Sequence, residues 1–118
     1  VLYSKHRKTL YTYPKAKLAT AFTVDSAVTE IAYRAFYGAK NIETLTIAGV
    51  VTVRDQAFEG VGIKTIKFTN TTASTFAGRN IFLGANAEIK ISVPNSSLGA
   101  FKSNVLIDYS IIDKFVGA

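Results

Sequence analysis

The sequence contains no cysteine, methionine or tryptophan, and only two prolines and one histidine among its 118 residues. Without cysteine, disulfide bonds, zinc–thiolate sites and cysteine nucleophiles are all excluded. No apolar run approaches the roughly 20 residues that a membrane-spanning helix requires. Because methionine is absent and the chain begins at Val1, we expect a processed or excised segment of a longer protein.

Acidic residues are missing from the start of the chain. Five of the 14 basic residues lie in the first 17 positions, which contain no acid, so the remaining nine nearly balance the eight acids. These five form a candidate basic patch interleaved with tyrosines: Lys5, Arg7, Lys8, Lys15 and Lys17. Such a patch fits an anionic partner, either an acidic glycan, a lipid surface or nucleic acid. We favour the simpler interpretation of a soluble capping hairpin whose lysines discourage edge pairing, and we do not expect nucleic acid as a partner.

Valine, isoleucine and threonine dominate the composition, with 34 of the 118 residues. β-Branched residues favour strands. Hydrophobic residues make up 48% of the chain and charged residues 19%. This balance predicts a folded, strand-rich domain rather than a disordered chain.

Three short sequence elements recur in phase along the chain. One is a tight turn that carries phenylalanine and then glycine, in Ala35–Gly38, Ala57–Gly60 and Ile81–Gly84. A second reads as a strand, in Phe22–Val24, Leu45–Ile47, Ile66–Phe68 and Ile89–Ile91. A third, in Val28–Ile31 and Val50–Val53, reads as a shorter strand, and its next copy near residues 72–77 is degenerate. No unit can bury its apolar side alone, so stacked units predict a continuous core with a column of phenylalanines.

The repeats resemble BspA-type leucine-rich repeats, in which units such as LTSVTIPDSVTSIGDYAFSGC follow one another at about this spacing. The similar stretches are Phe22 to Gly38, Ile42 to Gly60 and Ile63 to Gly84. Residues 1–14 resemble the hairpin that often precedes these repeats, and Ile91–Pro94 with Ala100–Lys102 resembles the closing segment of the family. The family often has cysteine after the glycine turn, where this chain has Ala39, Val61 and Ala85.

The resemblance implies a mainly β fold of the α/β solenoid type, a short right-handed leucine-rich repeat solenoid. We expect one domain, with a hairpin cap at residues 1–20, three to four repeats at 21–94 and a helical C-terminal cap at 95–118. Within the last segment, Asn95-Ser96-Ser97 predicts the N-cap of a short helix through Lys102, and Val105–Val116 has the spacing of an amphipathic helix. The alternative is a small β-sandwich, which leaves the repeat period unexplained.

Residues with catalytic chemistry are few and scattered. The single histidine, His6, lies in a basic turn with no nearby acid, and no two of the eight acids are closer than four positions. No phosphate-binding glycine loop is present. We therefore predict no catalytic site, no metal site and no cofactor.

A candidate binding face follows from strand alternation. If the apolar residues of the recurring strands point inward, the residues between them point outward. Aligning the repeats predicts one outward row of Thr23, Thr46, Lys67 and Lys90 and a second row of Thr44, Thr65 and Glu88. In this alignment Lys67 and Lys90 are neighbours of like charge. The candidate binding face is Thr23, Thr44, Thr46, Thr65, Lys67 and Lys90.

The resemblance also implies a function. It predicts a non-catalytic adhesion module, secreted or on a bacterial surface, that binds proteins such as host extracellular matrix or plasma proteins. The alternative is a structural spacer in a larger surface protein, with no ligand of its own. Open β-edges at the ends of the repeats predict a weak homodimer as well.

Overall fold

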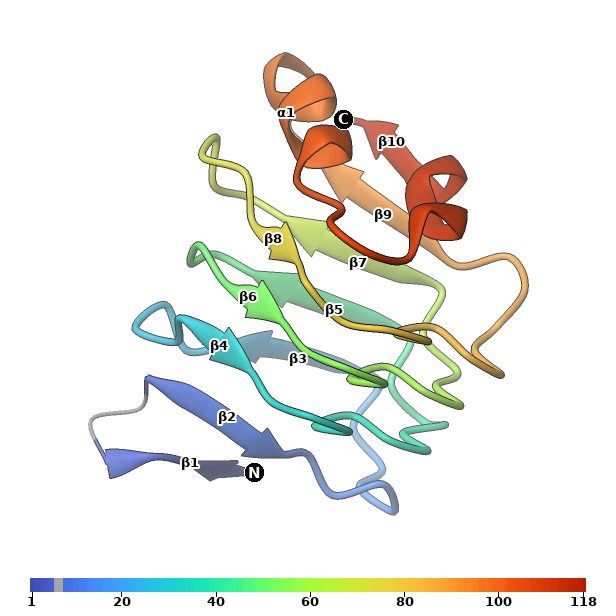
Figure 1. The fold of residues 1–118 in the computed structure, drawn as a ribbon. Helices are drawn as coiled ribbons and strands as arrows, with labels where there is room; N and C mark the ends of the chain where they lie inside the picture. The colour runs from blue at the N-terminus through green and yellow to red at the C-terminus, as the bar shows by residue number, and fades with distance from the viewer. Residues whose placement is uncertain (6–7) are drawn as a thin grey trace.

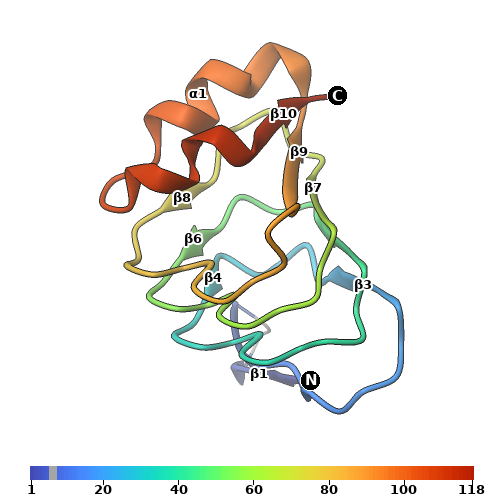
Figure 2. The same cartoon turned by 90° about the vertical axis from the view of Figure 1, so that its right-hand side faces the viewer.

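The structure is a computed structural model that describes residues 1–5 and 8–118, and its strands form two five-stranded sheets (Figure 1). The first sheet contains, in order, β1 (Leu2–Tyr3), β2 (Thr9–Thr12), β4 (Glu30–Ile31), β6 (Thr52–Val53) and β8 (Thr75–Phe76). The second contains β10 (Phe115–Gly117), β9 (Lys90–Val93), β7 (Thr65–Phe68), β5 (Thr44–Ile47) and β3 (Ala21–Val24). Figure 2 shows the two sheets on opposite sides of the molecule, joined by stacked turns.

From β3 to β9 the chain alternates between the two sheets, and each sheet is built from every second strand. Among the described residues, all pairs of strands are parallel except β1 with β2, which form an antiparallel hairpin. Residues one repeat apart pair directly, so Phe22 lies beside Leu45 and Leu45 beside Ile66. The period of the sequence repeats is therefore the spacing, in residues, between paired positions of neighbouring parallel strands. The alternative fold, a small β-sandwich, did not explain this period.

The core lies between the sheets because the longer strands alternate apolar and polar residues. In β5, Leu45 and Ile47 are fully buried while Thr44 and Thr46 point outward. The same alternation recurs in β7, where Ile66 and Phe68 are buried. Burial of one such side chain contributes roughly 1.5–3 kcal/mol of transfer free energy, so the repeated inward positions supply most of the stabilisation.

A column of stacked aromatic rings runs through the turns at one end of the sheets. Phe36, Phe58 and Phe82 stack at centroid distances of 5.2 and 5.5 Å with nearly parallel planes. Tyr13 adds a fourth ring, 5.3 Å from Phe36. Tyr13 lies 23 residues before Phe36, which is one repeat period, although the sequence interpretation assigned this segment only to a hairpin. The repeat therefore begins inside the segment predicted to be a cap.

The third repeat, whose short strand looked degenerate, forms that strand in register. Phe76 of β8 pairs with Val53 of β6. After the strand, Gly78 packs closely against the preceding repeat, where a Cβ atom would lie 2.3 Å from the backbone of Arg54. Before the strand, the buried hydroxyl of Ser74 accepts a hydrogen bond from the amide of Val51 at 3.0 Å.

The prediction of a short helix after β9 is confirmed, but not its cap. A 3-10 turn at Asn95–Ser97 leads into α1 (Leu98–Ser103), and no side chain caps the start of either element. The Ser97 hydroxyl instead donates to the carbonyl of Thr71. Phe101 of α1 is buried with its ring centroid 5.3 Å from that of Phe68.

The predicted amphipathic helix over Val105–Val116 is wrong. Only Tyr109–Lys114 is helical, as a 3-10 helix, and the chain then forms strand β10 parallel to β9. Ile107, which in a helix would share the face of the buried Ile111 four residues later, is 41% exposed. The strand prevails because it gives the β9 edge a hydrogen-bonded neighbour while burying Phe115 edge-on against Phe76, at 5.3 Å.

Candidate protein-binding face

The outer surface of the second sheet is a polar face built by four parallel strands. We define the sheet face as the outward residues of β3, β5, β7 and β9, which are Ala21, Thr23, Thr44, Thr46, Thr65, Lys67, Lys90 and Ser92. All of them are exposed or partly exposed, whereas the intervening residues of β5, β7 and β9 are buried. All six residues predicted for a binding face therefore lie on one surface.

The predicted alignment of these rows is wrong at β9. The pairing places Ser92, not Lys90, beside Lys67, and places Lys90, not Glu88, beside Thr65. The cause is a turn at Asn86, whose side-chain oxygen accepts the amide hydrogen bond of Glu88 at 3.0 Å and whose carbonyl accepts that of Ile89. This turn uses two more residues than the repeat alignment allowed.

The corrected register separates the two lysines on the sheet face. Lys67 lies between Thr46 and Ser92 along one row, and Lys90 lies beside Thr65 in the other. The two ammonium groups are thus diagonal neighbours rather than direct ones, which weakens the repulsion expected from the sequence alignment. The face combines separated positive charges with rows of hydroxyl groups.

The polar groups of this face have no internal partners in the described chain. None of its threonine or serine hydroxyls makes a hydrogen bond, and neither lysine makes an ion pair, within residues 1–5 and 8–118. The face contains no acid, and the nearby Glu43 is paired with Lys64 at 3.1 Å. These hydroxyl and ammonium groups are available to an external ligand without breaking any internal bond.

The candidate basic patch is divided by the structure. Arg7 lies outside the described residues, as does His6. Lys5 and Lys8 lie in the connection between β1 and β2, whereas Lys15 and Lys17 follow the end of β2, a strand labelled in Figure 1. Lys17 places its ammonium group 5.5 Å from the ring centroid of Tyr13 and covers the first ring of the aromatic column. The four described lysines therefore form two groups at opposite ends of one strand.

The titratable groups are dispersed over the surface. Among the described residues there is no group of three or more metal-ligating side chains, and no helix is long and apolar enough to cross a membrane. The exposed Arg54–Glu30 pair, at 3.6 Å, contributes little to stability, and the Arg34–Glu59 pair, at 3.7 Å, is partly exposed. Burial of the Tyr13 side chain raises its pKa by desolvation.

Residues 10–116 match the family model of the BspA type leucine rich repeat region, in six copies. The chain belongs to the BspA-type leucine-rich repeat family. The six copies extend into both segments that the sequence interpretation assigned to caps, in agreement with Tyr13 at one end and the β9–β10 pairing at the other. Leucine-rich repeats of this kind generally mediate protein interactions and are generally not catalytic. No curated protein matches the sequence.

Proposed function

We propose that this BspA-type domain is a non-catalytic adhesion module of a secreted or surface-attached bacterial protein, and that it binds host extracellular matrix or plasma proteins through the sheet face. The observation that carries the proposal is the unpartnered hydroxyl and ammonium groups gathered on that face. The family, whose members typically lie on bacterial surfaces, supports the location. We further propose that the repeats form a right-handed solenoid, with residues 1–20 and 95–118 closing its ends.

The proposed mechanism is recognition by a prearranged surface. Each strand of the sheet face is held by parallel neighbours, so Thr46 and Lys67 keep a fixed spacing before a partner arrives. A rigid surface loses little conformational entropy on binding. The hydroxyls offer both donors and acceptors, and the two lysines favour a partner surface with acidic groups, including an acidic glycan.

The test compares two charge-matched double variants of the purified domain. Thr46→Glu with Lys67→Glu alters adjacent positions of the sheet face. Thr52→Glu with Lys40→Glu introduces the same charge change at partly or fully exposed positions outside it. Binding to immobilised fibronectin, fibrinogen and an acidic polysaccharide is measured at physiological and at high salt, after thermal melts confirm that both variants fold.

We expect saturable protein binding that survives high salt and weakens at least about tenfold in the sheet-face variant, with the control unchanged. Equal weakening of both variants would refute the assignment to the sheet face. Binding could instead disappear at high salt and depend on Lys5, Lys8, Lys15 and Lys17. This result would show that the N-terminal segment attracts polyanions by charge alone, and it would refute recognition by the sheet face.

The second candidate function is a structural spacer within a longer surface protein. The continuous stacking of short, similar turns favours it, because repeats of this kind hold other segments apart without a ligand. Failure of the domain to bind any member of a panel of host proteins, while folded, favours this spacer. Sedimentation of the same samples tests the weak homodimer expected from open sheet edges.

A further inference from the structure

The Phe36 turn and the Phe58 turn of the aromatic column are each joined to the next turn by three backbone hydrogen bonds. The amides of Arg34, Phe36 and Gly38 donate to the carbonyls of Asp55, Ala57 and Glu59 at 3.3, 2.8 and 2.9 Å. One repeat later, the amides of Gln56, Phe58 and Gly60 donate to the carbonyls of Arg79, Ile81 and Leu83 at 3.0, 3.0 and 2.8 Å. The donors and the acceptors both come from alternate residues, as in a parallel ladder.

The third turn has the same donors but no acceptors. Asn80, Phe82 and Gly84 occupy the corresponding positions, and their amides donate to no group in the described part of the chain. Asn80 and Gln56 share a left-handed backbone, with φ of 50° and 55°, and Gly84 and Gly60 share a φ of 68°. Because the backbone repeats, these three N–H groups face the space where a fourth turn would lie.

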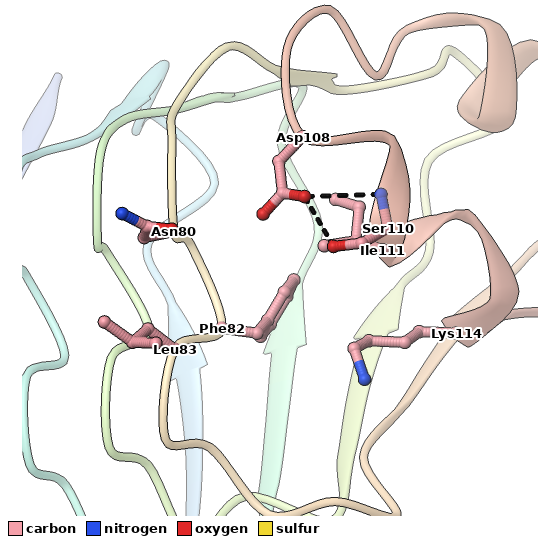
Figure 3. Close-up of a pocket in the computed structure, with 7 residues that line it drawn as sticks. All are labelled: Asn80, Phe82, Leu83, Asp108, Ser110, Ile111 and Lys114. Atoms are coloured by element: carbon pink, nitrogen blue, oxygen red, sulfur yellow. Dashed lines mark hydrogen bonds between the residues drawn. The ribbon is translucent and has the colours of Figure 1, made fainter.

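The aromatic column also ends at this point. Phe82 stacks on Phe58 through one face, and no other ring within the described residues stacks on its second face. The space beside it is a pocket of about 360 Å³ (Figure 3). It lies between the third turn and the segment that carries the last 3-10 helix, and it is lined by Asn80, Phe82, Leu83, Asp108, Ser110, Ile111 and Lys114.

The polar groups of this pocket combine hydrogen-bond donors with one carboxylate. The one bonded oxygen of Asp108 accepts from the amide and hydroxyl of Ser110, which fixes that carboxylate within its own turn. Lys114 makes no ion pair, and the Asn80 side-chain amide makes no hydrogen bond, within residues 1–5 and 8–118. The backbone amides of Asn80 and Phe82 belong to residues that line the pocket, and Gly84 follows the lining residue Leu83. Together these donors favour a ligand rich in acceptors that carries a flat apolar group.

We propose that this pocket binds an extended peptide segment of another protein. An aromatic side chain of the peptide enters the pocket and packs against the exposed part of Phe82, which is 8% exposed, and alternate peptide carbonyls accept hydrogen bonds from the amides of Asn80, Phe82 and Gly84. The peptide thus continues the ladder by one turn, at a site separate from the sheet face. This is addition of an extended segment to an exposed row of backbone donors.

A second copy of this chain does not present the required segment. Its phenylalanines at the matching repeat positions, Phe36 and Phe58, are fully buried within its own stack. Its first ring, Tyr13, is only 3% exposed and lies beneath Lys17. The segment must therefore come from a chain in which it is not already packed.

The test uses a capped octapeptide that copies residues 54–61, because this sequence supplies the same acceptors and ring to the first turn. It is titrated into the isotope-labelled domain and followed by amide chemical shifts. We expect saturable shifts at Asn80, Phe82 and Gly84, with the already bonded amides of Phe58 and Gly60 as internal controls. A peptide with alanine in place of its phenylalanine is the matched ligand control, expected to bind about tenfold more weakly.

Several results would overturn the proposal. They are an absence of saturable shifts at peptide concentrations up to about 5 mM, equal binding of the alanine peptide, or shifts confined to the sheet face. The Phe82→Leu variant, which keeps an apolar side chain, must remain folded and bind more weakly. Shifts of the same three amides on concentrating the domain alone would assign the pocket to a second copy and refute a foreign peptide.

Discussion

Replacement of Phe58 by alanine tests whether the aromatic column stabilises the domain. Phe58 is fully buried and stacks on Phe36 at 5.2 Å and on Phe82 at 5.5 Å. Truncation of a core phenylalanine to alanine typically costs about 3–5 kcal/mol. An aromatic pair adds about 0.5–1.5 kcal/mol beyond its buried area, so two stacked neighbours place Phe58→Ala in the upper part of this range, at about 4–5 kcal/mol.

Phe82→Ala is the matched comparison within the same column. Phe82 has a single stacked neighbour, and a pocket borders its other side. We expect Phe82→Ala to cost about 3 kcal/mol. This cost is lower than that of Phe58→Ala because Phe82 has one stacked ring fewer, and because truncation beside a pocket creates less new cavity. Phe58→Leu, which retains most of the apolar volume, should cost about 1–2 kcal/mol and remains measurable if the alanine variant does not fold.

The assay is urea unfolding followed by far-ultraviolet circular dichroism and by tyrosine fluorescence. The midpoint and the slope are both compared, because an unchanged slope is needed to convert midpoint shifts into free energies. Coincident curves from the two probes test the two-state assumption. A loss below about 1 kcal/mol for Phe58→Ala would refute the role of the column. Equal losses at Phe58 and Phe82 would refute the contribution of the second stacking partner.

Four further predictions concern buried polar groups and the hydrogen-bond ladder. Tyr13→Phe should stabilise the domain by about 1 kcal/mol, because the buried Tyr13 hydroxyl has no hydrogen-bond partner among the described residues; a destabilised variant in urea unfolding would contradict this. Burial raises the pKa of Tyr13 above its value in the unfolded chain, so the stability of the domain is unaffected by titration of this group below the unfolded pKa and falls as pH rises through the folded value; above about pH 10 the wild-type domain should lose more stability than Tyr13→Phe. Ser74→Ala should cost about 1–3 kcal/mol by leaving the Val51 amide without its buried acceptor, and a neutral result would show that water replaces the hydroxyl. In hydrogen exchange, the Phe58 amide should be protected and the Phe82 amide should exchange much faster, whereas equal protection would mean that Phe82 has an acceptor.

Most of the sheet face could be predicted from the sequence, because it depends on the local alternation of apolar and polar residues along each strand. Thr44 and Thr46 flank the buried Leu45, so their outward direction follows from the two-residue period of a strand. The row of the sheet face in which Lys90 lies could not be predicted from the sequence, because it depends on how many residues the preceding turn at Asn86 uses. The pocket beside Phe82 was missed as well, since it exists only where the stack ends against a segment more than twenty residues later.

The sequence by itself determined three features of this protein: the repeat period, the family, and the set of residues that face the core. These features recur every 21 to 24 residues and are set by local spacing, so each copy reinforces the interpretation of the others. Tertiary structure decided the features that occur once. Tyr13 joins the aromatic column because Phe36 offers it a ring face, and β10 forms as a strand because β9 offers it a backbone edge. Neither partner is visible within the local sequence, since contacts between distant segments, and not local spacing, make these conformations the most stable.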